Sequence, residues 1–159
     1  MSNNLAGNKG LANLGNTCYM NSAIQCLSHL LEFHPKNDDF IELLNQSDEL
    51  YESWYNTQIH LWSSLGENVV VPTIFLKKFM SCCAEKDICF YNFNQNDTEE
   101  FINIFMNLLH ESIKLRAEIS VDGTPTNQIE RLQVKSVKSW SDFFKNDYSY
   151  IIQTFYSQQ

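Results

Sequence analysis

The stretch "GLANLGNTCYMNS", residues 10–22, joins a polar loop to a segment with the pattern of a helix. Gly10, Gly15 and several small polar residues precede Cys18. Beyond Cys18, apolar residues recur at the three- and four-residue spacing of one helical face, namely Met20, Ala23, Ile24, Leu27, Leu30 and Leu31. The pattern predicts a helix that begins at Cys18 and ends near Pro35, because the residue before a proline avoids helical geometry.

The composition predicts one domain with a hydrophobic core, since 43% of the 159 residues are apolar. The net charge of −8 argues against nucleic acid as a partner and favours a basic peptide or surface. No apolar run approaches the roughly 20 residues that span a bilayer, so we expect no membrane association. Five cysteines without a secretory signal predict reduced thiols inside a cell, in the cytoplasm or the nucleus.

The remaining pattern is mainly helical. Three more helices are predicted: one from Asp38 or Asp39 to about Gly66 with a break near Gln46–Asp48, one opened by Pro72 and Thr73, and one capped by Asp97 or Thr98. Val69–Val71 is too short for us to predict a strand, and residues 89–95 are predicted as an irregular loop. Residues 118–139 are polar and contain Gly123 and Pro125, which predicts an exposed insert or loop. The predicted fold class is therefore mainly α.

A cysteine at the start of a helix is a candidate nucleophile. The first helical turn has a partial positive charge and unpaired N–H groups, which stabilise a thiolate and an oxyanion formed by its attack on a carbonyl. Asn13 is placed to add a side-chain amide donor to such an oxyanion hole. The alternative is a buried structural cysteine at a helix end, and the residue pattern alone leaves both open. Cys82, Cys83 and Cys89 lack a second ligand pair, so we expect buried or semi-buried thiols there, no metal site and no cofactor.

Three motifs resemble the ubiquitin-specific proteases, a papain-like family of deubiquitinating enzymes. Every position of "GLANLGNTCYMNS" except Ala12 matches the cysteine box of that family. "QNDTEEF", residues 95–101, is similar to a Gln-x-Asp-x-x-Glu-Phe element, and "YSYIIQTFYSQQ", residues 148–159, resembles a later segment in which Ser157 replaces the usual glycine. The resemblance covers residues 10–159 and implies the helical thumb of a protease whose palm and fingers lie outside this sequence.

The resemblance also implies roles for individual residues. Cys18 matches the catalytic nucleophile and Asn13 matches the oxyanion-hole donor. Gln95, Asp97 and Glu100 match positions near the channel for the ubiquitin C-terminal tail, which is rich in arginine and ends in Gly-Gly. Carboxylates there would pair with arginines. The competing interpretation is that the acidic residues only cap a helix; we assign both roles to Asp97.

A general base for Cys18 is missing from the pattern. None of the four histidines, His29, His34, His60 and His110, lies in a motif that resembles the histidine box of the family. We therefore expect an N-terminal fragment or truncated product with little hydrolase activity of its own, which acts on ubiquitin or a ubiquitinated protein together with a complementary palm-and-fingers chain. The alternative is a non-catalytic remnant that binds ubiquitin or another partner. We also expect oligomers, because residues 143–156 would be partly uncovered.

Overall fold

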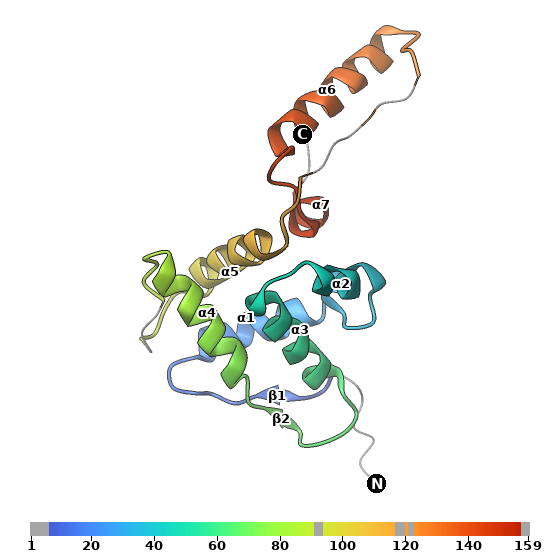
Figure 1. The fold of residues 1–159 in the computed structure, drawn as a ribbon. Helices are drawn as coiled ribbons and strands as arrows, with labels where there is room; N and C mark the ends of the chain where they lie inside the picture. The colour runs from blue at the N-terminus through green and yellow to red at the C-terminus, as the bar shows by residue number, and fades with distance from the viewer. Residues whose placement is uncertain (1–6, 91–93, 117–119, 121–122, 157–159) are drawn as a thin grey trace. The chain divides into compact units, whose positions relative to one another are not determined.

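The computed structural model describes residues 7–90, 94–116, 120 and 123–156. The chain divides into two compact units, Met1–Ser112 and Ile113–Gln159. Helices dominate both units, and the strands among the described residues are two of two residues each, so the predicted mainly α fold class is confirmed (Figure 1). No described helix is long and apolar enough to cross a membrane.

The first unit contains most of the helices. They are α1 (Cys18–Ser28), α2 (Asp38–Glu42), α3 (Glu49–Trp62), α4 (Thr73–Glu85) and α5 (Thr98–Ile113), with 3-10 turns at Leu31–Phe33 and Leu43–Asn45. The predicted break near Gln46–Asp48 is confirmed, because Asp48 begins a new helix there. Its Oδ1 accepts hydrogen bonds from the N–H groups of Leu50 (2.9 Å) and Tyr51 (3.1 Å), which satisfies two of the otherwise unpaired donors of α3.

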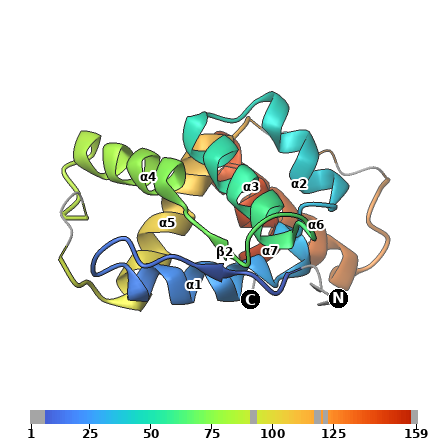
Figure 2. The same cartoon turned by 90° about the horizontal axis from the view of Figure 1, so that it is seen from below.

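The core of the first unit is an aromatic cluster around α5. Phe101 and Phe105 of α5 are fully buried. The ring of Phe101 lies 5.2 Å from Phe79 of α4 and 5.9 Å from Tyr19 of α1, and the ring of Phe105 lies 5.0 Å from Trp54 of α3, measured between centroids. Edge-to-face pairs of this kind add roughly 0.5–1.5 kcal/mol each beyond the area that they bury. Helices α1, α3 and α4 therefore all pack against α5, and Figures 1 and 2 show α4 beside it.

Helix α1 is shorter than the sequence predicts. It ends at Ser28, not near Pro35, and Leu31 is 79% exposed although we assigned it to the buried stripe. A distant residue binds this end of the helix: Nε1 of Trp62, at the end of α3, donates a hydrogen bond of 2.9 Å to the carbonyl oxygen of Ser28. The chain leaves the helix two residues later, where Leu30 has an extended conformation.

A short parallel sheet holds the chain ahead of α1. Strand β1 (Gly10–Leu11) pairs with strand β2 (Val69–Val70), with Gly10 opposite Val69. The N–H of Gly10 donates to Asn68 O and the N–H of Ala12 donates to Val70 O, both at 2.9 Å. The sequence pattern of residues 69–71 was too short to predict this strand, which the structure shows at Val69–Val70. Local pattern does not reveal this pairing, because the two strands lie about 60 residues apart in the sequence.

The second unit contains α6 (Gln128–Phe144) and α7 (Tyr150–Phe155). Of the predicted insert at 118–139, the described residues are mostly exposed, but those from Gln128 onward are helical rather than a loop, and Asn127 caps that helix by accepting from the N–H of Glu130 at 2.9 Å. Backbone bonds join Leu115 to Tyr148 on either side of α6. Gly123 and Pro125 precede the helix and do not interrupt it. The position of Ser157 in the third motif lies outside the described residues.

Candidate active site

Cys18 is the first residue of α1, and its side chain is exposed. The alternative of a buried structural cysteine is therefore wrong. In the first turn of a helix the backbone N–H groups have no intrahelical partner, and their dipoles add to a partial positive charge. An electrophilic carbonyl can thus approach the thiol from solvent at a place where hydrogen-bond donors are concentrated.

The loop ahead of Cys18 is held by two side chains. Oδ1 of Asn13 accepts three hydrogen bonds, from the N–H of Gly15 (3.1 Å), the N–H of Thr17 (3.1 Å) and the hydroxyl of Thr17 (3.0 Å). The hydroxyl oxygen of Thr17 in turn accepts from the N–H of Leu14 at 3.1 Å. Asn13 and Thr17 thus close a ring of bonds that fixes the backbone immediately before the nucleophile candidate.

A third amide attaches this loop to the helix. Nδ2 of Asn21, one turn beyond Cys18, donates to Ala12 O at 3.1 Å and more weakly to Leu11 O at 3.4 Å. The residues before the loop are therefore anchored on α1, while β2 holds them from the other side. The sequence pattern predicts no separate role for Thr17 or Asn21. Both lie inside the first motif, which was the available signal, but their partners become visible only in three dimensions.

The second motif lies against the first. Asn96 donates from Nδ2 to the hydroxyl oxygen of Tyr19 at 3.2 Å, which joins the residue after Cys18 to the loop before α5. The Tyr19 ring is buried edge-on against Phe90 and Phe101, at centroid distances of 6.1 and 5.9 Å. Burial raises the pKa of the Tyr19 hydroxyl above its usual range, although the bond from Asn96 opposes the shift.

The predicted tail-binding residues stand at the start of α5. Asp97 caps the helix: its Oδ1 accepts from the N–H of Glu99 at 2.7 Å and of Glu100 at 3.2 Å. Gln95, Asp97 and Glu100 are all exposed. The capping role predicted for Asp97 is thus confirmed, and the exposure of the three side chains leaves them accessible to a basic ligand. Glu99 stands in the first turn, where a negative charge stabilises the helix.

Three of the four histidines lie at the far end of α1. His29 follows its last residue, and 11 residues at 1.5 Å each place it roughly 16 Å along the axis from Cys18. The His34 ring packs 4.4 Å from the ring of Trp62, measured between centroids. His60 belongs to the last turn of α3, the end that Trp62 joins to Ser28. None of the three is within proton-transfer distance of the thiol.

The fourth histidine is also remote. His110 comes 12 residues after Thr98, so it lies roughly 18 Å along α5 from the end that meets α1. Because all four histidines of the sequence are described, none of them serves as a hydrogen-bonded base for Cys18 in this conformation.

Comparison with known proteins identifies the family. A family model described as ubiquitin carboxyl-terminal hydrolase matches residues 9–158. The chain belongs to the ubiquitin carboxyl-terminal hydrolase family. The match begins at the residue before β1 and includes both motifs that meet at Tyr19.

Individual members of the family are similar over most of this chain. Ubiquitin carboxyl-terminal hydrolase 10 of Arabidopsis thaliana is 34% identical over 67% of the chain, and ubiquitin carboxyl-terminal hydrolase 5 of the same plant is 32% identical over 78%. Ubiquitin carboxyl-terminal hydrolase 2 of Homo sapiens is 28% identical over 96%. The aligned part is only 12%, 14% and 26% of the length of these three proteins. The chain thus spans a small part of the relatives that it matches.

The other cysteines of this family member differ in exposure. Cys83 is fully buried, and burial, followed by the neighbouring Cys82, raises the pKa of its thiol to about 12. Cys82 is half-buried, and burial raises its pKa as well. Cys26 and Cys89 are exposed, so the prediction of a buried or semi-buried thiol is wrong for Cys89. Exposure alone therefore does not distinguish Cys18; its place at the helix start does.

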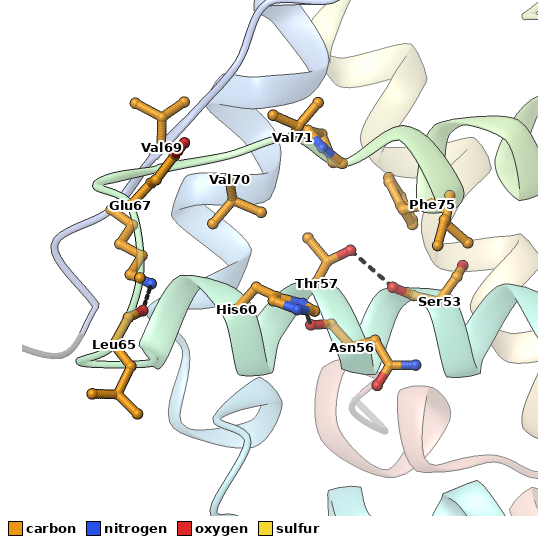
Figure 3. A pocket seen from close by; sticks show the side chains of 14 residues that line it. Ser53, Asn56, Thr57, His60, Leu65, Glu67, Val69, Val70, Val71 and Phe75 are labelled. Carbon is orange, nitrogen blue, oxygen red and sulfur yellow. Dashed lines mark hydrogen bonds between the residues drawn. The ribbon is translucent and has the colours of Figure 1, made fainter.

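A separate cavity of about 410 Å³ lies between α3 and β2, and no residue of the two motifs lines it (Figure 3). Val70 and Thr57 line it, and His60 lies on its floor. The polar side chains of α3 bond to their own helix: the Thr57 hydroxyl donates to Ser53 O at 2.8 Å, and Nδ1 of His60 lies 2.7 Å from Asn56 O. The cavity contributes no group to the Cys18 site.

Proposed function

We propose that this chain is the nucleophile-bearing part of a thiol-dependent ubiquitin C-terminal hydrolase. The observation that supports it best is the junction of the two motifs: Cys18 opens α1 in an exposed position, and its neighbour Tyr19 bonds Asn96 at the start of α5. In this proposal the thiol and the exposed Gln95, Asp97 and Glu100 face the same substrate, with Tyr19 and Asn96 between them. Membership of the ubiquitin carboxyl-terminal hydrolase family points to ubiquitin or a ubiquitinated protein as the substrate.

The proposed reaction is acyl transfer at the isopeptide carbonyl after the Gly-Gly tail. The thiolate of Cys18 forms a carbon–sulfur bond, and the carbonyl oxygen takes the negative charge of the tetrahedral intermediate. Nδ2 of Asn13 and the first-turn N–H groups of α1 would hold that oxyanion. The intermediate then expels the lysine amine, which gains a proton, and water later cleaves the thioester. Asp97 and Glu100 would pair with arginines of the ubiquitin tail.

We propose that the base for this reaction comes from a residue outside this sequence, on a complementary chain or segment. The histidines of the chain support this, because none lies within reach of Cys18. General-base assistance typically contributes roughly 10²–10⁴-fold to the rate. We therefore expect hydrolysis of a fluorogenic ubiquitin substrate by the 159-residue chain to be slower by about that factor than hydrolysis by a complete family member. A comparable rate would contradict the proposal.

A second candidate function is ubiquitin binding without catalysis. The same distance between Cys18 and the histidines favours it, because the exposed residues at the start of α5 can bind a basic tail without any reaction. In that case the chain would act as a binding module for ubiquitin or another basic partner, and Cys18 would not react with the bound partner.

Covalent labelling separates the two candidates. The chain is incubated with ubiquitin bearing a C-terminal electrophile, and the adduct is followed by intact mass spectrometry. The enzyme proposal expects an adduct that Cys18→Ala abolishes and that Cys26→Ala, which removes an exposed cysteine from the same helix, does not change. Binding in a pull-down assay without an adduct would support the binding module. An adduct that survives Cys18→Ala would refute Cys18 as the nucleophile.

A further inference from the structure

Thr17 is a buried residue that takes no direct part in the proposed reaction. Its side chain contacts Asn13, which is the proposed donor to the oxyanion. Only 5% of its surface is exposed, and its hydroxyl bonds both Asn13 and Leu14. We propose that Thr17 is a positioning residue, which orients the Asn13 amide so that its Nδ2 group is directed to the oxyanion. This inference rests on the proposed function, because it concerns the same site.

An asparagine amide has two ends of nearly equal size and opposite hydrogen-bonding character. Only the Nδ2 end can donate to an oxyanion; the Oδ1 end would repel it. In this structure Oδ1 accepts from three donors, two backbone N–H groups and the Thr17 hydroxyl. If the amide rotated by half a turn, the NH₂ group would face the two backbone N–H donors and their two bonds would be lost, while the Thr17 hydroxyl would have to accept from the amide and could no longer donate to it. The two backbone donors therefore select the orientation in which Nδ2 is turned away from them, and the hydroxyl holds the amide in that place.

The hydroxyl of Thr17 is the side-chain member of this set. The N–H groups of Gly15 and Thr17 would be present whatever the side chains were, whereas the hydroxyl depends on the residue type. It donates to Asn13 Oδ1 and accepts from Leu14 N, so a single group joins the amide to the loop backbone. Thr17 is buried and Asn13 is exposed, so the bond is shielded from water on the Thr17 side only.

The ordinary explanation for a threonine at this position is helix capping, and the geometry argues against it. Thr17 immediately precedes α1, but its side chain accepts no capping hydrogen bond from the helix, and its backbone angles, φ −95° and ψ 14°, differ from the extended conformation of a typical cap. Its hydroxyl is directed into the loop and not into the first turn. The hydrogen-bonding capacity of the side chain is thus used for Asn13.

The test compares two reagents on the 159-residue chain. Addition of Cys18 to a ubiquitin C-terminal aldehyde forms a carbon–sulfur bond and places negative charge on the aldehyde oxygen, which then gains a proton. Alkylation by iodoacetamide forms a carbon–sulfur bond and expels iodide, so no oxyanion develops. A group that orients an oxyanion donor should affect the first reaction and leave the second unchanged.

Thr17→Val keeps the shape of the side chain and removes the hydroxyl, whereas Thr17→Ser keeps the hydroxyl. We expect Thr17→Val to slow aldehyde addition by at least about tenfold, because removal of one oxyanion donor usually costs a rate factor of that size or more. Alkylation of Cys18 should change by less than about twofold, since no oxyanion forms in that reaction. Thr17→Ser should restore most of the loss. The matched control is Thr57→Val, which removes the hydroxyl of another buried threonine of the first unit and should change neither rate.

A double variant tests whether Thr17 acts through Asn13. On an Asn13→Ala background, Thr17→Val should cause no further loss of aldehyde addition, because the amide that it orients is gone. Equal losses on both backgrounds would overturn the inference, and so would wild-type aldehyde reactivity in Thr17→Val.

Amide hydrogen exchange tests the inference independently of the chemistry. The N–H groups of Leu14 and Gly15 should exchange faster in Thr17→Val and at the wild-type rate in Thr17→Ser, because the first bonds the Thr17 hydroxyl and the second bonds the amide that it holds. Unchanged exchange would overturn the role of Thr17. A wild-type chain that iodoacetamide alkylates but the aldehyde does not modify would instead contradict the proposed function.

Discussion

At the scale of the residue, the loop before Cys18 depends on backbone conformations that few residues adopt. Gly15 and Asn16 both have positive φ angles, 102° and 49°. Asparagine tolerates the left-handed region better than other side chains, and glycine has no Cβ to oppose it. The sharp reversal lets the N–H groups of Gly15 and Thr17 converge on one oxygen, Oδ1 of Asn13. Gly15 and Asn16 thus provide the left-handed backbone of the turn, and Asn13 provides the oxygen that accepts its hydrogen bonds.

Gly15→Ala should destabilise the loop through backbone strain alone. No atom lies within 4 Å of an added Cβ, so no clash contributes, but the φ angle of 102° disfavours any L side chain. We expect a loss of about 1–2 kcal/mol in the free energy of unfolding, measured by urea denaturation. Gly10→Ala is the matched control, since it also has open space and no positive φ angle. An equal loss in both variants would show that strain at Gly15 is not the cause.

The cysteine thiols should differ in reactivity, and the more deeply buried ones should react more slowly. Burial raises the pKa of Cys83 to about 12, so at pH 8 only roughly one molecule in 10⁴ carries the thiolate there. We expect iodoacetamide to modify Cys83 at least about 10³-fold more slowly than a free thiol of ordinary pKa near 8.5, even before access is considered. Peptide mapping by mass spectrometry after timed quenching measures the rates. Modification of Cys83 as fast as that of the exposed Cys26 would contradict the buried position.

At the scale of the element, the sequence predicts most of what local pattern can specify. The stripes of α3, α4 and α5, the break near Asp48 and the cap Asp97 follow from residue spacing and cap chemistry, whereas α2 is capped by Asn37 and not by the predicted Asp38 or Asp39. The end of α1 and the β1–β2 pair do not, because Trp62 and Val69 act on them from distant parts of the chain. The same applies to the site: the motif predicts Cys18 and Asn13, but not the bonds that Thr17, Asn21 and Tyr19 make around them.

The start of α5 offers a way to separate capping from ligand binding. Asp97→Ala should lower the free energy of unfolding by about 1 kcal/mol, because the N–H groups of Glu99 and Glu100 lose their acceptor. Asp97→Asn retains a capping oxygen and should leave stability nearly unchanged. If the Asp97 charge pairs with arginines of a ubiquitin tail, both variants should slow labelling by the ubiquitin electrophile. Full labelling of Asp97→Asn would limit Asp97 to the capping role.

At the scale of the whole molecule, apolar side chains stand in solvent on the second unit. Ile129, Leu132 and Phe143 of α6 are 70%, 61% and 78% exposed. Exposed apolar side chains in such number on one helix favour association.

We therefore expect the isolated chain to self-associate. Its apparent mass, measured by light scattering after size-exclusion chromatography, should rise with protein concentration, and Leu132→Glu combined with Phe143→Ser should reduce the rise. Ile59→Ser removes a side chain that is 41% exposed in the first unit and serves as the control. A monomer at every concentration would contradict the prediction.

The bond between Tyr19 and Asn96 determines when the site can form during synthesis of the chain. The two residues are separated by 77 positions, and a ribosome adds roughly 5–20 residues per second, so Cys18 is made about 4–15 s before the residue that completes its surroundings. Strand β2, which holds the chain ahead of the thiol, also comes later. Throughout that interval Cys18 of the nascent polypeptide lacks the folded surroundings of the site. The site is assembled only when translation has passed the start of α5.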